Sequence, residues 1–133
     1  MKASELKIGN LVSLDGRVST VLGIDHRNSL KVKNDFSTFQ TSCLNVEPIP
    51  LTEDWLKRFR FEKDNYGTFV LNSIDKNEND LWLKIQDNDF GIALNLFHNK
   101  KEPTFLDSIS YLHQLQNLYF ALTGTELTLK QPL

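Results

Sequence analysis

The chain has 133 residues, of which 40% are hydrophobic and 24% are charged. This length and hydrophobic content are typical of one globular domain with its own core, and they exclude a disordered chain. Fifteen basic and 17 acidic residues give a formal net charge of −2, which excludes a protein that is basic overall and wraps nucleic acid.

The sequence lacks the signals of secretion and membrane insertion. Residues 1–10 contain no apolar core of a signal peptide, and no run reaches the roughly 18 apolar residues of a membrane-spanning helix. Cys43 is the only cysteine, which excludes an internal disulfide and favours a buried thiol. We expect a cytoplasmic protein that does not associate with a membrane.

The first 47 residues predict short strands separated by turns. Asp15-Gly16 is a strong signal for a two-residue hairpin turn. Alternating and β-branched residues on either side predict a small curled antiparallel sheet, similar to an SH3-like barrel. The expected strands are Ile8–Leu14, Arg17–Ile24 and Leu30–Lys33, with Ser42–Val46 as a further candidate and Phe36–Phe39 ambiguous.

The rest of the chain predicts a connector, a meander and a helix. Glu47–Pro50 is a stiff extended connector, and Thr52 is the expected N-cap of a short helix over residues 53–60. Gly124 suits the left-handed end of a second helix. We therefore expect a single α+β domain over residues 1–133, divided into 1–47, 48–60 and 61–133. Its later elements are strands at 68–71, 81–85, 90–96 and 105–111, a helix at 112–123 and an edge strand at 126–129.

The last helix is unusual because residues 108–125 contain no Asp, Glu, Lys or Arg. One half of its surface is apolar and suits the core, whereas the other half carries amides, a histidine and an aromatic ring. This composition favours a contact with another protein or a second copy. The rival interpretation is that the face packs under the protein's own meander. The residues predicted to bind a partner are His113, Gln116, Asn117 and Phe120.

Three stretches of the sequence resemble one family. The string Tyr111-Leu-His-Gln-Leu-Gln-Asn-Leu-Tyr-Phe-Ala-Leu-Thr-Gly124 is similar to the C-terminal signature of small uncharacterised proteins encoded by Bacteroidetes-group bacteria, their prophages and phages. Residues 5–12 and 46–56 also resemble that family, whereas Thr125 stands where the family has a second acidic residue. The resemblance implies a phage or mobile-element accessory protein in the cytoplasm of a bacterial host cell, and it transfers no site residues.

No catalytic or metal-binding pattern stands out. Residues 75–80 begin like a calcium loop, but Asp80 stands at the position that requires glycine, so a turn between strands is the better interpretation. His26, His98 and His113 have no paired spacing. We therefore expect a protein that is not an enzyme and that has no metal or cofactor.

The main alternative is a nucleic-acid-binding accessory protein that uses the N-terminal sheet. Small barrels bind nucleic acid through basic faces and exposed aromatics, and Phe36 and Phe39 are candidates for stacking. Interleaved aspartates count against this alternative. A binder of a small ligand or an enzyme ranks third. The residues predicted for the nucleic-acid alternative are Arg17, Arg27, Lys31 and Lys33.

Overall fold

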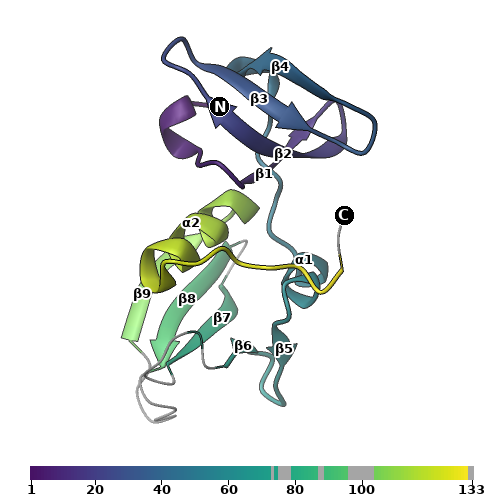
Figure 1. The fold of residues 1–133 in the computed structure, drawn as a ribbon. Coiled ribbons are helices and arrows are strands. Elements are labelled where there is room, and N and C mark those ends of the chain that lie inside the picture. Colours follow the sequence, from purple (N-terminus) through teal and green to yellow (C-terminus); the bar gives the residue numbers. More distant parts are fainter. Residues whose placement is uncertain (73, 75–78, 87–88, 96–103, 132–133) are drawn as a thin grey trace.

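The computed structural model describes residues 1–72, 74, 79–86, 89–95 and 104–131. It has an α+β fold with two antiparallel sheets (Figure 1), as the sequence predicts. The first sheet contains β1 (Leu11–Leu14), β2 (Arg17–Ile24), β3 (Ser29–Lys33) and β4 (Thr38–Ser42) in that order. The second contains β5 (Glu62–Lys63), β6 (Phe69–Leu71), β7 (Asp80–Gln86), β8 (Asp89–Asn95) and β9 (Thr104–Ile109). The α-helices are α1 (Glu53–Arg58) and α2 (Leu112–Thr123).

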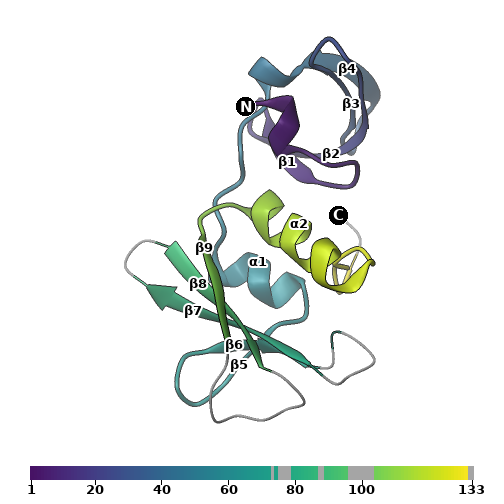
Figure 2. The ribbon, with the colours of Figure 1, turned by 90° about the vertical axis from the view of Figure 1, so that its left-hand side faces the viewer.

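The N-terminal sheet is curled, so that one of its faces encloses a small core (Figure 2). The predicted hairpin between β1 and β2 is confirmed, because Asp15 and Gly16 both have positive φ angles, of 51° and 78°, as a type I′ turn requires. The enclosed core is made mainly of aliphatic side chains, and it includes the predicted buried thiol. Its buried members are Leu6, Val12, Leu14, Val21, Leu30, Val32, Cys43 and Val46.

The connector joins both halves of the molecule by backbone hydrogen bonds. Ser13 and Glu47 exchange two such bonds of 2.8 Å, and the Leu112 N–H donates to the Ile49 carbonyl at 2.8 Å. The predicted N-cap is confirmed, since Thr52 Oγ1 accepts a hydrogen bond of 3.3 Å from the Trp55 N–H. The connector is therefore fixed at both ends before α1 begins.

The second sheet carries both helices on one of its faces (Figure 2). Phe69, Leu83 and Ile92 lie opposite one another on neighbouring strands and are fully buried. Leu112 and Leu115 of α2 belong to the same core and are also fully buried. Gly124 ends α2 with a φ of 73°, as predicted. None of the helices in the described part of the chain is long and apolar enough to span a membrane.

The predictions of a strand over residues 42–46 and of an edge strand over residues 126–129 are wrong. Residues 43–45 form a 3₁₀ turn, because Ser42 Oγ accepts a hydrogen bond from the Leu44 N–H and turns the chain there. Residues 126–129 form no strand, since Leu127 packs into the core of the second half and the Lys130 N–H donates to the Arg58 carbonyl. We call residues 125–131 the C-terminal arm, which runs past α1 (Figure 1).

The two halves share part of one core. Leu11 of β1 points away from the enclosed core of its own sheet, is 5% exposed and belongs to the core of the second half. Val18 of β2 packs against that same core. The N-terminal sheet therefore uses both faces of β1 and β2, and the second face lies against α2 and the C-terminal arm.

Candidate functional site

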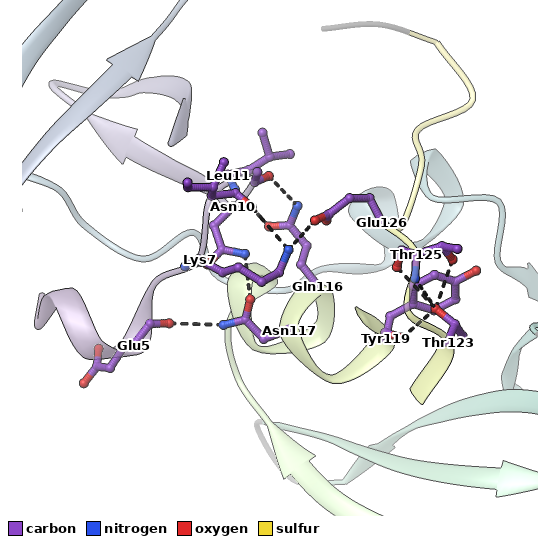
Figure 3. Close-up of polar contacts among 12 residues, drawn as sticks. Glu5, Lys7, Asn10, Leu11, Gln116, Asn117, Tyr119, Thr123, Thr125 and Glu126 are labelled. Atoms are coloured by element: carbon purple, nitrogen blue, oxygen red, sulfur yellow. Dashed lines mark hydrogen bonds and ion pairs between the residues drawn. The ribbon is translucent and has the colours of Figure 1, made fainter. Parts of the chain in front are cut away.

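The uncharged face of α2 is held by the N-terminal segment (Figure 3). Gln116 is 3% exposed, its Oε1 accepts a hydrogen bond of 2.8 Å from the Leu11 N–H, and its Nε2 donates to the Gly9 carbonyl at 3.2 Å. Asn117 Oδ1 accepts from Asn10 Nδ2 at 2.8 Å, and Asn117 Nδ2 donates to the Glu5 carbonyl at 3.1 Å. Both amides therefore use their donors and acceptors inside the chain.

This arrangement explains why the covered positions on this face of α2 carry no charge. A charged side chain at Gln116 would be buried against Leu11 and Gly9 without a counter-ion, at a high cost in free energy. The geometry supports the internal interpretation for Gln116 and Asn117. The covering element is the N-terminal segment, however, rather than the meander that this interpretation named.

The other two predicted partner-binding residues lie between the two amides around the helix axis, at opposite ends of that face along α2. Phe120 is 39% exposed, and Lys7 Nζ lies 4.2 Å from the centre of its ring while pairing with the Glu126 carboxylate. His113 is 4% exposed, and burial lowers its pKa, while the charge of Glu5 raises that pKa to a smaller extent. Of the four predicted residues, Phe120 is the most exposed.

The four predicted basic residues do not form one cluster. Lys31 and Lys33 lie on the outward face of β3, because they alternate with buried Leu30 and Val32. Arg27 lies in the turn between β2 and β3, where Asp25 Oδ1 accepts hydrogen bonds from the backbone of residues 27 and 29. The structure brings Arg17 and Lys33 to a common groove, and it places Arg27 and Lys31 outside the lining of that groove.

We call the hollow beside the outward face of β1–β3 the basic groove. Its largest part has a volume of about 470 Å³ and lies between this face, α2 and the C-terminal arm. A second hollow shares Val18, Asn34 and Asp35 with the first, and a third shares Arg58 with the second. The charged residues and the exposed ring that line the three parts are Arg17, Lys33, Asp35, Phe36, Lys57, Arg58 and Lys130.

The electrostatics of the groove contrast with the net charge of the chain. Its lining has five basic side chains and one carboxylate, that of Asp35. None of these basic side chains forms an ion pair with a residue that the structure describes; the ion pairs found there join Lys7 to Glu126 and Lys63 to Glu53. The groove therefore offers uncompensated positive charge to a ligand.

An exposed aromatic ring stands at the wall of the groove. Phe36 is 77% exposed, and Arg17 Cζ lies 4.3 Å from the centre of its ring. Arg58 Cζ lies 4.1 Å from the ring centre of Trp55, which orients the guanidinium beside the groove. Phe39, by contrast, is partly buried and packs against the enclosed core of the sheet, so its ring is less available for stacking than that of Phe36.

Sequence reasoning missed three of the basic residues in the groove. Lys57 and Arg58 suit the last turn of a helix, where positive side chains favour the helix dipole, so their pattern gave no sign of a site. Lys130 is isolated in the sequence. Lys57 and Arg58 lie at the groove on α1 itself. Lys130 joins them because the C-terminal arm pairs with the end of α1, where the Lys130 N–H donates to the Arg58 carbonyl at 2.8 Å.

Metal-binding groups do not gather in the described part of the chain. No group of three His, Cys, Asp or Glu side chains suits a metal ion among those residues. Cys43 is 3% exposed, and His26 lies in an exposed turn. His98 and most of the calcium-like segment, residues 75–78, lie outside the described residues.

Comparison with known proteins gave no relative: no family model, no curated protein and no solved structure matches this chain.

Proposed function

We propose that the chain is a non-catalytic binding protein and that the ligand of its basic groove is single-stranded nucleic acid. The observation that carries this proposal is the exposed Phe36 ring with the Arg17 guanidinium over it, beside basic side chains that form no ion pair with any described residue. Proteins that bind single strands combine a positive groove that follows the backbone with aromatic rings that stack on bases.

The exposed Phe36 ring at the groove favours a single strand over a duplex. Bases in a duplex are already stacked on one another, so a ring such as that of Phe36 gains a partner only from an unpaired base. Arg17 adds a flat guanidinium next to this ring, which suits both a base and a phosphate. The net charge of −2 does not oppose this, because phosphates respond to the local field of the groove.

The family resemblance suggests a biological context for this binding protein. A binding protein without a catalytic constellation suits an accessory role in a phage or mobile element. Binding of a protein partner is the second candidate function, and the exposed Phe120 at the edge of α2 favours it. The two candidates use different surfaces, so they are tested separately.

The test is fluorescence anisotropy with a labelled oligothymidylate of about twelve nucleotides, measured over a series of salt concentrations. We expect binding that weakens with a logarithmic slope of about −2 to −3, as contacts to three or four phosphates produce. Arg17→Glu with Arg58→Glu should abolish this binding.

The matched control is Arg27→Glu with Lys84→Glu, which changes the net charge equally at exposed positions outside the groove. Equal losses of oligonucleotide affinity in both double variants would show that binding depends on net charge alone. The assignment of the binding site to the basic groove would then be wrong. An absence of binding at low salt would refute the proposed function.

A further inference from the structure

A second cavity lies against the first turn of α2 and shares no lining residue with the basic groove. Its volume is about 600 Å³. The N-terminal segment, the connector, β9 and α2 all contribute to its wall. The lining residues that matter for its chemistry are Glu5, Asp107, Tyr111 and His113.

His113 is a buried polar group that lacks a partner in this cavity. The residue is 4% exposed, and its Nδ1 atom is buried with no hydrogen-bond partner. Neither ring nitrogen forms a hydrogen bond with any residue that the structure describes. Since buried polar atoms in native proteins nearly always have a partner, the imidazole is a group that a ligand can satisfy.

The surroundings of His113 select the charge of that ligand. Glu5 and Asp107 come from different segments, and neither forms an ion pair with a described basic side chain. The positive group in the lining is the amino terminus of Met1, which donates to the Cys43 carbonyl at 3.4 Å. Burial lowers the pKa of His113, so the imidazole is neutral and accepts a hydrogen bond. An anionic ligand would face two carboxylates here.

A flat wall completes the cavity. The ring of Tyr111 stacks on that of His113, with 6.0 Å between centres and 15° between planes. Planar cations such as guanidinium pack well against aromatic faces and donate several hydrogen bonds in one plane. The cavity therefore combines an acceptor, two carboxylates and an aromatic face.

We propose that this cavity binds a small organic cation, whose N–H groups donate to the His113 imidazole and to the carboxylates of Glu5 and Asp107. The chemistry fits a guanidinium or amine that belongs either to a free metabolite or to a side chain of a peptide. This site is independent of the proposed nucleic-acid groove, because a cation in the cavity meets none of the residues that would bind phosphates.

The experiment follows the His113 ring resonances by NMR while agmatine, a free guanidinium compound, is added. Its uncharged urea isostere, N-carbamoylputrescine, is the matched control. A second pair of probes is a short peptide that contains arginine and the same peptide with citrulline in its place. We expect a saturable shift with a charged probe and none with its neutral isostere. Tighter binding of the peptide assigns a peptide source, and tighter binding of agmatine assigns a free metabolite.

Glu5→Gln with Asp107→Asn should weaken binding by at least about tenfold, as loss of charge-assisted hydrogen bonds does. Glu62→Gln with Asp64→Asn, exposed acids that line a different hollow, should leave binding unchanged. If the first variant does not fold, the proposal is tested by the wild-type titrations that compare each charged probe with its neutral isostere. Equal shifts with charged and neutral probes, or no saturable shift with either charged probe, would overturn the site.

Discussion

The side-chain amide of Gln116 in α2 accepts a hydrogen bond of 2.8 Å from the backbone N–H of Leu11 in β1, 105 residues earlier in the chain. The same amide donates to the Gly9 carbonyl. One side chain thus satisfies a donor and an acceptor of the N-terminal segment at the place where the two halves meet. This contact fixes the outward face of β1 against α2 and forms one wall of the basic groove.

Gln116→Ala should lower the free energy of unfolding by about 1–3 kcal/mol, because it leaves the buried Leu11 N–H without a partner. Chemical denaturation measures this change. Gln40→Ala is the control, since Gln40 is an exposed amide on β4 and its loss should cost no more than about 0.5 kcal/mol. Equal effects of the two changes would contradict the role of Gln116.

Leu115→Ala should cost about 2–5 kcal/mol, because the side chain is fully buried and its removal leaves a cavity. The helical pattern suggests the same cost for Leu122, but the structure leaves this side chain partly exposed at the edge of the core. Leu122→Ala should therefore cost about 1–2 kcal/mol. Thermal unfolding of the two variants side by side tests this order, and a larger loss at Leu122 would show that α2 is rotated.

Phe120→Asp should leave the chain folded, with a loss of no more than about 1 kcal/mol from the contact between Lys7 and the ring. Sedimentation velocity of the wild type and the variant measures self-association at the same time. If the wild type associates through this edge of α2, the variant should be a monomer. Severe unfolding of Phe120→Asp would mean that the ring is part of the core.

Phe36→Ala should weaken binding of a single-stranded oligonucleotide by about 1–3 kcal/mol through loss of stacking, with little effect on stability. Tyr66→Ala is the matched control, because this ring is 88% exposed but lies in the turn after β5, away from the groove. Competition binding at one fixed salt concentration compares the two. A similar loss for both variants would mean that exposed rings bind the strand without a defined site.

His113 should make the protein less stable as the pH falls. Burial lowers the folded-state pKa of His113 below its usual value of 6.5, so the unfolded chain takes up a proton that the folded chain does not. Stability is therefore complete above about pH 6.5 and is lost as the pH falls through the folded-state pKa. Glu5, Asp107 and the Met1 amino group line the same cavity as the imidazole, and the charge of Glu5 opposes this trend to a smaller extent.

The measurement is the midpoint of urea unfolding at about pH 7 and about pH 5. His113→Gln should reduce the difference between the two midpoints, whereas His26→Gln, in an exposed turn, should keep it. A wild type that is more stable at the lower pH would show that His113 is protonated in the folded chain.

Local chemistry in the sequence determined much of the secondary structure. The Asp15-Gly16 turn, the Thr52 cap and the Gly124 end of α2 each depend on residues within a few positions, so they were predictable. Apolar periodicity also predicted α2 with its bounds. β5 was not predictable in this way, because it has two exposed residues and no pattern of its own, and it forms by pairing with β6.

Only the tertiary structure decided where the sites lie. Charge depletion over residues 108–125 indicates that α2 is covered, but the covering segment is set by the pairing of Gln116 with residues 9 and 11, which no local pattern encodes. Arg17 and Arg58 likewise meet at the basic groove because the fold brings the end of α1 beside β2, although the two residues are far apart in the sequence. The sequence alone determined the elements because their formation depends on neighbouring residues. The tertiary fold determined which residues of these elements come together at a surface site. Contacts between distant segments depend on which faces pack together and bury the most apolar area.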